Sequence, residues 1–297
     1  MVIGASGLLG SHIVKESKNR YNVIATFNSH PIDIAGCEAV QIDITDSQKT
    51  KDIILKINPD CVILSAAQRN VDFCEKNQKE VTRINVTGAQ NVAVASDKVR
   101  AKLIYISTDL VFDGSKEMYN ENDPTNPVQH YGKTKLEGEL QVASALDDYA
   151  IARVSVLYDW NLFDYTTNFV TWIYSKLKKN ESLSLFTDQF RCATYIKNSC
   201  EALLSIYEKD EKGIFHVAGK NCVSRHHIGL QVAKIFGFDE SLITTMESSE
   251  SEWKALRPKK CCLDVGKMEG KLGVNSVSIE EGLHRMKEEL NHASGSL

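Results

Sequence analysis

A glycine-rich stretch, Gly4-Ala5-Ser6-Gly7-Leu8-Leu9-Gly10, opens the chain and decides its fold class. The apolar pair Val2-Ile3 precedes it, and apolar residues with helical spacing follow from Leu8. This order predicts a strand, a tight turn and a helix, because glycine allows positive φ and close approach of the backbone to a ligand. The N-terminus of such a helix offers free N–H groups and a partial positive charge. The stretch therefore predicts a site for the pyrophosphate of a dinucleotide.

The glycine stretch has an unusual spacing, and the strand expected before it is short. Its spacing is G-x-x-G-x-x-G, whereas simple dehydrogenases carry G-x-G-x-x-G. Only three residues precede Gly4, fewer than a central strand usually has. We therefore expect either that residues are missing upstream of Met1 or that Met1 is not the natural start.

The composition limits the classes of protein to consider. The chain has 297 residues, 42% hydrophobic and 25% charged, which suits one large α/β domain or such a domain with a smaller lobe. The net charge of −4, without a long basic run, gives no indication of a nucleic-acid partner. No apolar stretch approaches the roughly 20 residues of a membrane span, and no leader segment stands out. We expect a cytoplasmic protein with no nucleic-acid or membrane partner.

The cysteines and histidines indicate no metal site. The eight cysteines show neither a C-x-x-C pair nor regular spacing, so we expect reduced thiols. His226 and His227 are adjacent rather than four residues apart, which is unfavourable for a shared metal ion.

Strands and helices alternate in the first half of the chain. Strands are expected at 21–27, 39–42, 61–65, 101–106 and 149–156, and helices at 46–57, 79–95 and 131–145. Buried strands that alternate with helices predict an α/β fold with a doubly wound parallel sheet, covered on both faces. Ligands of such sheets bind beyond the carboxyl ends of the strands. The motifs of this half follow predicted strands, so we expect them at one edge of the sheet.

The end of the second predicted strand bears on the choice of cofactor. An Asp or Glu there would bind the ribose 2′-hydroxyl and favour NAD, but this chain reads Asn28-Ser29-His30. No carboxylate repels a 2′-phosphate, so we expect NADP(H), with NAD(H) as the alternative. Asp43 and Ile44 should lie beside the adenine. Ala66 and Ala67 are small enough to let the dinucleotide cross the sheet edge.

Two further motifs carry the chemistry. Ser107-Thr108-Asp109 follows a predicted strand, and Tyr131 and Lys135 share one helix face at i, i+4. A free tyrosine ionises near pH 10, and a nearby lysine ammonium with a nicotinamide ring should lower that pKa. Thr108 is expected to donate a hydrogen bond to the substrate carbonyl. Asp109 is expected to assist proton transfer or to bind a sugar hydroxyl.

The chain resembles the extended short-chain dehydrogenase/reductases, and among them the dTDP-4-dehydrorhamnose reductases, over nearly its whole length. The matching strings are the glycine stretch, Asp43-Ile44-Thr45-Asp46, Ser65-Ala66-Ala67, Asn85-Val86-Thr87-Gly88, Ser107-Thr108-Asp109-Leu110-Val111-Phe112-Asp113-Gly114, Tyr131-Gly132-Lys133-Thr134-Lys135, Asp188-Gln189 and Arg257-Pro258. The resemblance implies reduction of a 4-keto nucleotide-activated deoxysugar with NAD(P)H. It implies Tyr131 as proton donor, Lys135 as its partner and Thr108 as the group that polarises the carbonyl. A homodimer is expected from the same resemblance.

Site residues follow from these motifs and from the resemblance. The expected cofactor contacts are Gly4, Ser6, Gly7, Leu8, Leu9, Gly10, Asn28, Ser29, His30, Asp43, Ile44, Ala66, Ala67, Gln68, Asn85, Tyr131 and Lys135. The expected substrate contacts are Arg69, Thr108, Asp109, Val111, Asn168, Gln189 and Arg257, with Arg257 near the diphosphate.

The second half of the chain is expected to form a smaller substrate lobe. Helices are predicted at 168–178, at 224–236 after a serine cap, and at 280–290, with a strand at 215–217. We expect an NADP-binding Rossmann domain at 1–160. A mainly substrate-binding lobe should follow at 161–297, with some strands returning to the sheet. The polar tail from His292 to Leu297 is expected to be disordered.

Three departures from the reductases leave alternatives open. Val156 stands where that family often has tryptophan, and Cys192-Ala193-Thr194 stands for its proline-threonine pair. The loop Ala66-Ala67-Gln68-Arg69-Asn70-Val71-Asp72 is as close to A-A-E-R-R-P-D of the regulatory β subunit of methionine adenosyltransferase as to the reductase loop. That sister group binds NADP and acts as an interaction subunit. An NADP-binding regulatory subunit and a nucleotide-sugar 4-epimerase therefore remain alternatives, while Leu110 after Asp109 argues against a dehydratase.

Overall fold

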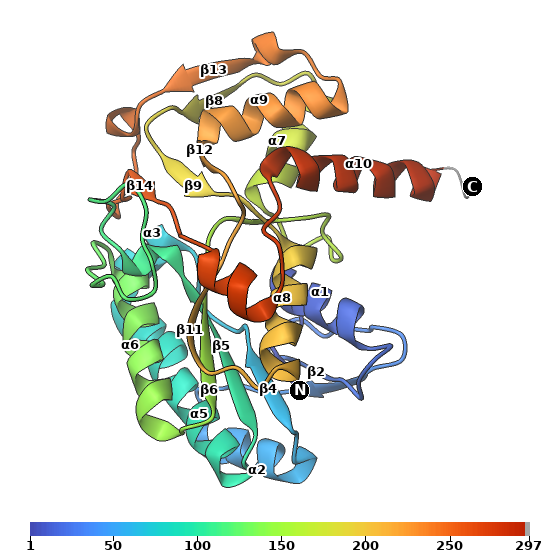
Figure 1. Cartoon of the computed structure of the whole chain (residues 1–297), viewed down its shortest axis with the longest axis vertical. Helices are drawn as coiled ribbons and strands as arrows, with labels where there is room; N and C mark the ends of the chain where they lie inside the picture. The colour runs from blue at the N-terminus through green and yellow to red at the C-terminus, as the bar shows by residue number, and fades with distance from the viewer. Residues whose placement is uncertain (295–297) are drawn as a thin grey trace.

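A parallel sheet forms the centre of the larger part of the molecule (Figure 1). The structure is a computed structural model that describes residues 1–294, and the side-chain surroundings of residues 1–292. The sheet strands are β1 (Val2–Ile3), β2 (Ile24–Phe27), β3 (Glu38–Gln41), β4 (Cys61–Leu64), β5 (Lys102–Thr108), β6 (Tyr149–Val154) and β11 (Gly213–Val217). Their order is β11-β6-β5-β4-β1-β2-β3, and every neighbouring pair is parallel. The expected doubly wound α/β fold is confirmed.

Helices cover both faces of this sheet. On one face, α1 (Leu8–Ser17) and α8 (Ile196–Glu208) share an apolar core with the strands. On the other face, α2 (Ser47–Ile57), α5 (Gly88–Lys98) and α6 (His130–Ala145) form a second core around β4 and β5. All seven residues of β5 are buried, as expected for a central strand of a parallel sheet that is covered on both faces.

The helix predicted at 79–95 is three consecutive segments in the structure. α3 (Val71–Lys76) lies before them, and then come α4 (Gln78–Thr82), the π-helical η1 (Arg83–Thr87) and α5. The π-helical segment changes the hydrogen-bond register within one continuous helical path. Apolar spacing alone could not show this change, because the side-chain pattern continues through it.

A smaller lobe lies above the sheet in Figure 1. Its helices are α7 (Phe169–Lys178), α9 (Arg225–Phe236) and α10 (Ile279–Ser294). Its strands are β7 (Leu157–Tyr158), β8 (Leu183–Phe186), β9 (Phe190–Cys192), β10 (Thr194–Tyr195), β12 (Cys222–Ser224), β13 (Ile243–Met246) and β14 (Lys260–Cys261). They pair as β10-β7, β12-β9-β14 and β13-β8.

Four further short helical segments occur in the two layers, within the described residues. One-turn 3-10 helices are η2 (Asp109–Val111), η3 (Glu240–Leu242) and η4 (Ser248–Glu250), and η5 (Met268–Leu272) is π-helical.

A helix cap, a domain boundary and a disordered tail were expected in the second half of the chain. Ser224 caps α9, since its hydroxyl oxygen accepts a hydrogen bond from the His227 N–H at 3.1 Å. α8 and β11 come after residue 160 in the chain yet belong to the large sheet layer. The domain boundary at 160 stays a prediction. α10 continues to Ser294, so the expected disorder is wrong that far, and residues 295–297 lie outside the described part.

One pair of cysteines contradicts the expectation of reduced thiols. Cys222 and Cys262 form a disulfide, with Cα atoms 5.6 Å apart and 40 residues of sequence separation. β12 and β14 both pair with β9, and this three-stranded sheet brings the two cysteines together. Spacing along the sequence could not reveal a contact made by that sheet. The free cysteines are Cys37, Cys61, Cys74, Cys192, Cys200 and Cys261.

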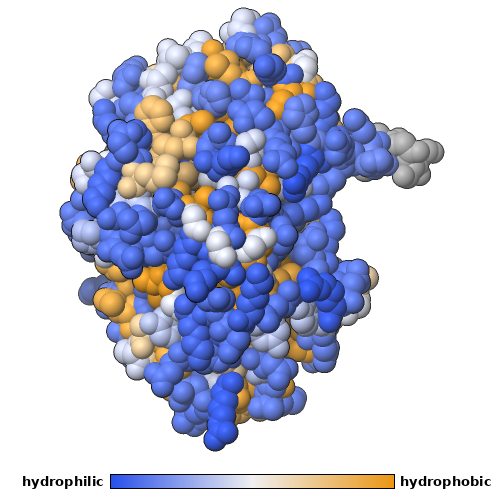
Figure 2. All heavy atoms as spheres, in the orientation of Figure 1, coloured by the Kyte–Doolittle hydropathy of each residue, from blue (hydrophilic) through white to orange (hydrophobic). Residues whose placement is uncertain are grey.

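Three further features of the described residues concern possible metal sites, membrane-spanning helices and the polarity of the surface. They hold no group of three or more His, Cys, Asp or Glu side chains that could bind a metal ion. None of their helices combines the length and the hydropathy needed to cross a membrane. The face drawn in Figure 2 is mainly hydrophilic, with hydrophobic residues in small groups.

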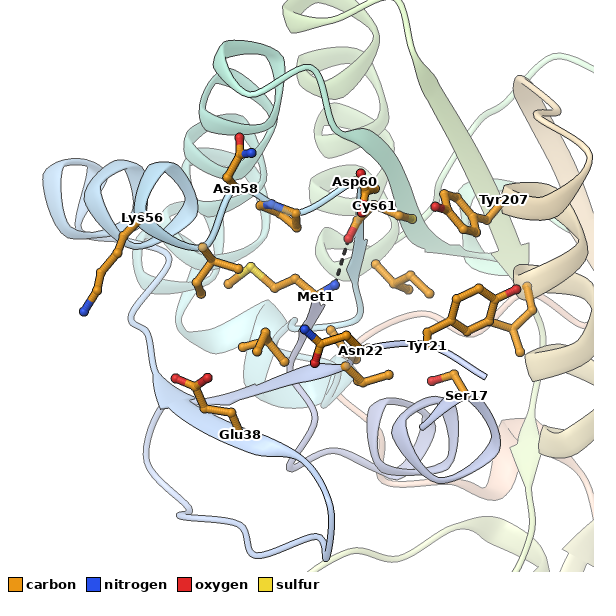
Figure 3. A pocket seen from close by; sticks show the side chains of 17 residues that line it. Met1, Ser17, Tyr21, Asn22, Glu38, Lys56, Asn58, Asp60, Cys61 and Tyr207 are labelled. Atoms are coloured by element: carbon orange, nitrogen blue, oxygen red, sulfur yellow. Dashed lines mark hydrogen bonds between the residues drawn. The ribbon is translucent and has the colours of Figure 1, made fainter. Parts of the chain in front are cut away.

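A cavity of about 480 Å³ lies at the amino ends of the central strands (Figure 3). Residues of β1, β2 and β4 line this cavity, among them Val2, Ile24 and Cys61. The Met1 ammonium donates a hydrogen bond to the Cys61 carbonyl oxygen at 2.8 Å, and burial lowers its pKa. This end of the sheet is opposite the edge where ligands of parallel sheets bind. The expectation of residues upstream of Met1 stays a prediction.

Candidate active site

A cleft of about 650 Å³ follows the carboxyl ends of the parallel strands and reaches the smaller lobe. Most of the predicted site residues line it: Gly4, Ser6, Gly7, Leu8, Leu9, Asn28, Ser29, Asp43, Ile44, Ala66, Ala67, Gln68, Arg69, Thr108, Asp109, Tyr131, Lys135, Asn168 and Arg257. Five predicted residues do not line it: Gly10, His30, Asn85, Val111 and Gln189. The fold therefore joins the glycine stretch and the predicted catalytic motifs in one cleft.

The glycine stretch fits a dinucleotide. Gly4 has φ +90°, and a Cβ there would lie 2.6 Å from the Ala66 amide nitrogen. Gly7 is the N-cap of α1 and offers no side-chain cap, so the first N–H groups of this helix stay free for a phosphate. A Cβ at Gly10 would lie 2.2 Å from the Gly4 carbonyl oxygen. Gly10 thus allows α1 to pack on the turn, and its expected contact with the cofactor stays a prediction.

The end of β2 places two polar side chains on the cleft. Asn28 and Ser29 line it, and the described end of this strand carries no carboxylate. The Ser29 hydroxyl lies 3.0 Å from His30 Nδ1, and the His30 ring stacks on Tyr165 with 4.7 Å between ring centroids. His30 therefore stands behind Ser29 rather than on the cleft wall.

Asn85 fixes the loop after β4. Its side-chain oxygen accepts from the Gln68 N–H at 2.8 Å, and its Nδ2 donates to the Gln68 carbonyl oxygen and to Thr134 Oγ1, both at 3.1 Å. Asn85 is buried, and its hydrogen bonds connect this loop to α6. Its hydrogen bonds position the loop that lines the cleft, and the expected contact of Asn85 with the cofactor stays a prediction.

Thr108 and Asp109 form the end of β5 and the start of η2. Thr108 Oγ1 donates to Asp109 Oδ1 at 3.0 Å, and the Ser155 hydroxyl donates to Oδ2 at 2.7 Å. Burial raises the pKa of Asp109, and the Arg191 guanidinium, with its Nε 3.6 Å away, opposes that rise. A hydroxyl has one proton to donate. Thr108 must therefore turn away from Asp109 before it can donate to a substrate carbonyl.

Packing at the start of α6 positions Tyr131. The Gln129 side chain caps this helix by accepting from the Gly132 N–H at 2.6 Å. A Cβ at Gly132 would lie 2.0 Å from the Leu110 carbonyl oxygen, so glycine here lets α6 pack directly on η2. This contact brings Tyr131 next to the end of β5.

The surroundings of Tyr131 favour the neutral phenol. Burial, followed by the charge of Asp109, raises the pKa of Tyr131 well above its ordinary value, and a hydrogen bond with Thr108 opposes this. Lys135 is not one of the main causes of this shift, and the expected lowering of the Tyr131 pKa by Lys135 together with a nicotinamide ring stays a prediction. A neutral phenol is the form that can donate a proton.

Lys135 is buried one helical turn further on. Burial lowers the pKa of Lys135 to about 7, and the Glu139 carboxylate opposes the change. Its Nζ lies 4.0 Å from the centroid of the Tyr105 ring. Glu139 is itself paired with Arg153 through two contacts, of 3.0 and 2.7 Å, and accepts from the Ser107 hydroxyl at 2.5 Å.

The predicted substrate residues of the lobe have different surroundings. Asn168 lines the cleft but caps α7, with its side-chain oxygen accepting from the Thr171 N–H at 3.1 Å. Val111 is fully buried in a satellite core. Gln189 is buried behind Arg225, whose Nε donates to Gln189 Oε1 at 3.2 Å. Arg225 lines the cleft and was not predicted from the sequence.

Comparisons with known proteins agree with this geometry. The model of the RmlD substrate binding domain matches residues 1–292. The probable low-salt glycan biosynthesis reductase Agl14 of Haloferax volcanii is 32% identical over 286 residues, covering 95% of each chain. The methionine adenosyltransferase 2 subunit beta of Xenopus tropicalis is 31% identical, covering 95% of this chain and 86% of its own length.

A solved structure extends the likeness to three dimensions. The dTDP-4-dehydrorhamnose reductase of Bacillus anthracis, in complex with NADP, matches with a TM-score of 0.85 and 30% identity. The match covers 97% of this chain and 98% of that one. Both resemblances stated from the sequence are confirmed. From the glycine stretch to α10, the chain belongs to the family of the RmlD substrate binding domain.

Proposed function

We propose that this protein is an NAD(P)-dependent reductase that converts the 4-keto group of a nucleotide-activated deoxysugar to a hydroxyl group. The observation that carries the proposal is one continuous cleft, lined at one end by the glycine stretch and at the other by Thr108, Tyr131 and Lys135. The solved relative from Bacillus anthracis supports it, because that reductase binds NADP.

The chain's own residues would supply the proton and hold the carbonyl. When bound, the reduced nicotinamide supplies a hydride to the carbonyl carbon. Tyr131, held as a neutral phenol, donates its proton to the carbonyl oxygen. Thr108 turns from Asp109 and donates a hydrogen bond to the same oxygen, while Asp109 keeps its bond from Ser155. The Lys135 ammonium then stabilises the phenolate that remains on Tyr131.

We favour NADPH over NADH. The support is the pair Asn28 and Ser29 on the cleft wall, at a strand end without a carboxylate. NADH stays the alternative, because a polar loop of this kind does not exclude it.

The test is oxidation of NADPH, followed by nicotinamide absorbance, with dTDP-4-dehydro-6-deoxy-L-mannose as substrate. NADH is run in parallel at the same concentration. Rapid oxidation, faster with NADPH, is the expected result. Tight NADPH binding without oxidation of this or any other 4-keto nucleotide sugar would contradict the proposal.

A regulatory role is the second candidate, favoured by the 31% identity to a methionine adenosyltransferase subunit. In that role the cleft would bind NADP without turnover. Co-purification with a methionine adenosyltransferase catalytic subunit, together with failure of the oxidation assay, would support it. Failure to co-purify would count against it.

The proposal also includes the cellular compartment of the protein and its oligomeric state. We place the protein in the cytoplasm, as the sequence leads us to expect, and expect a homodimer from the resemblance. Light scattering on the purified protein tests the dimer. A disulfide between Cys222 and Cys262 in freshly lysed cells would argue against a reducing compartment.

A further inference from the structure

Lys135 is a buried lysine whose side chain lines the cleft. Among the residues that the structure describes, none forms a hydrogen bond or an ion pair with its Nζ. A buried ammonium group without such partners is costly, because water no longer solvates its three N–H groups. Burial accordingly lowers the pKa of Lys135 to about 7. The proposed reduction uses the charged form, so a side chain that favours this form contributes to the reaction.

The face of an aromatic ring lies next to this ammonium group. Lys135 Nζ is 4.0 Å from the centroid of the Tyr105 ring, well within the roughly 6 Å over which a ring face attracts a cation. Tyr105 is only 1% exposed, so water hardly screens the contact. Burial also raises the pKa of Tyr105 well above its usual value, and the side chain stays a neutral phenol with a partial negative charge on its face. The ring therefore favours the protonated lysine.

Gly138 leaves the space that this ring occupies. A Cβ at position 138 would lie 2.3 Å from the Tyr105 hydroxyl oxygen and 2.9 Å from its Cζ. Lys135 and Gly138 are three residues apart on α6 and so share one face of the helix. Lys135 Nζ lies over the centre of the ring and Gly138 lies at its hydroxyl end. Because β5 is buried along its whole length, the ring has little room to move away from either residue.

The Tyr105 hydroxyl does not explain why a tyrosine stands here. It has no hydrogen-bond partner among the described residues, although a buried tyrosine hydroxyl usually has one. The described contacts of Tyr105 with α6 therefore depend on its ring. Phenylalanine would keep the ring and remove a buried polar group without a partner.

Glu139 is the main charge that acts on Lys135 besides the ring. It opposes the fall of the Lys135 pKa, but its carboxylate is already engaged with Arg153 and Ser107. Tyr131 precedes Lys135 by one helical turn. Other titratable side chains on the elements packed against the first turns of α6 are Cys74 and Glu75 of α3, Arg83 of η1, Asp109 of η2 and Arg153 of β6. None of these is a main cause of the shift at Lys135.

We propose that Tyr105 is a positioning residue for the reduction: its ring holds the Lys135 side chain in place and favours the ammonium form, and Gly138 keeps the space for the ring. Tyr105 does not line the cleft, so it acts through Lys135. The catalytic use of Lys135 rests on the proposed function. The contact between ring and ammonium group does not, because it exists in the protein alone.

The first measurement is the pKa of Lys135 in the protein without cofactor, from an NMR titration of isotopically labelled lysine. Lys135→Met assigns the signal, which is absent from that variant. Tyr105→Leu removes the ring and should move the titration midpoint to lower pH by about one pH unit, the size expected for a desolvated contact between a cation and a ring. Tyr105→Phe keeps the ring and should leave the midpoint unchanged.

A fluorine series separates the charge on the ring face from its shape. Phenylalanine with one, two or three ring fluorines, placed at position 105, packs almost as phenylalanine does. Each fluorine withdraws electrons from the ring face and so weakens its attraction for a cation. The Lys135 midpoint should therefore fall stepwise along the series.

The second measurement is the pH profile of NADPH oxidation with the 4-keto nucleotide sugar. The decline at high pH should begin at a lower pH in Tyr105→Leu than in the wild type, and Tyr105→Phe should restore the wild-type profile. Gly138→Ala should shift the profile in the same direction as Tyr105→Leu, because the new Cβ displaces the ring. Helix propensity alone would predict no such shift, since alanine only favours the helix.

Phe215→Leu is the matched control. Phe215 is a fully buried ring on β11 of the same sheet, and Lys267 Nζ lies 4.2 Å from its centroid. This variant removes a comparable contact between a ring and a lysine outside the cleft. It should lower the urea midpoint of unfolding without moving the pH profile or the titration of Lys135.

Each outcome has a definite meaning. A Lys135 midpoint that stays constant along the fluorine series would overturn the proposal and leave the proposed reductase intact, even if Tyr105→Leu does not fold. A shift in Phe215→Leu as large as that in Tyr105→Leu would overturn it as well. If the wild-type protein oxidises NADPH with no 4-keto nucleotide sugar, the proposed function fails, and the titration still decides whether the ring favours the ammonium form of Lys135.

Discussion

Glu139→Gln tests the buried ion pair between Glu139 of α6 and Arg153 of β6. The side chains of Glu139 and Arg153 are only 4% and 3% exposed, and they meet through contacts of 3.0 and 2.7 Å. Glutamine keeps the shape of the side chain but leaves the Arg153 guanidinium buried without a counter-charge. Breaking one side of such a pair costs about 3–5 kcal/mol. At about 2 °C per kcal/mol for a chain of this size, Tm should fall by about 6–10 °C.

The same substitution should also move the pH profile of the reaction. Burial lowers the pKa of Lys135 to about 7, and the Glu139 carboxylate limits that change. Without this carboxylate the pKa of Lys135 falls further, so the lysine loses its proton at a lower pH. The pH above which NADPH oxidation declines should therefore be lower in Glu139→Gln than in the wild type. A purely structural role for Glu139 would lower Tm without moving this limb.

Glu281→Gln is the matched control. Glu281 and Arg285 form an ion pair on α10 in which both side chains are about half exposed, at 52% and 47%. Removing an exposed pair should cost less than about 1 kcal/mol. Urea unfolding of both variants and of the wild type gives the comparison. The reasoning is refuted if Glu139→Gln unfolds within about 1 kcal/mol of the wild type and its pH profile is unchanged.

Three further predictions concern the site and the lobe. Thr108→Val should lower kcat of NADPH oxidation about 10²- to 10³-fold with little change in KM, because valine fills the space without donating a hydrogen bond; an unchanged kcat would contradict this. Lys135→Met should abolish turnover yet raise the urea midpoint at pH 6, because burial disfavours the ammonium group there. The folded pKa of Lys135, about 7, lies below the ordinary lysine pKa of 10.5, so the unfolded chain binds more protons between these values. Wild-type stability should therefore rise across that window and reduce the advantage of the variant; a lower midpoint at pH 6 would argue against the burial effect. Alkylation without reductant should leave Cys222 and Cys262 unmodified in mass spectra, and their reduction should cost about 4 kcal/mol for a closed loop of this length. Full labelling of both cysteines before reduction would disprove the disulfide.

Much of the large sheet was predictable because several of its strands are apolar runs followed by a helical pattern. Cys61–Leu64 and Lys102–Thr108 are of this kind. The lobe was less predictable, since its strands have two to four residues and carry no alternating pattern long enough to detect. β8 and β13 pair with each other across some sixty residues of sequence, as Ser184 and Thr244 show. Only tertiary packing brings such segments together.

The cleft was predictable where a local motif defines the position of a residue. Thr108, Tyr131 and Lys135 belong to short strings with fixed spacing, and all three line the cleft. Arg225 was missed because it follows Ser224, which indicates only the start of a helix. Its partner Gln189 lies on another segment, so no local pattern marks the pair.

Some motif residues hold the site together without touching the cleft. Asn85, Gly10 and Val111 belong to strings that the family shares, yet each is buried in packing or in a hydrogen-bond network. A string that resembles a family motif does not show whether each of its residues binds a ligand or supports a residue that does.

Turnover by Tyr131→Phe is the most direct test of the proposed reduction. NADPH oxidation would be followed with the 4-keto nucleotide sugar, and NADPH affinity would be measured by fluorescence in the same preparation. Because phenylalanine keeps the ring but has no proton to donate, kcat should fall about 10²- to 10⁴-fold while the Kd for NADPH stays nearly unchanged. Turnover at the wild-type rate in this variant would contradict the assignment of Tyr131 as the proton donor.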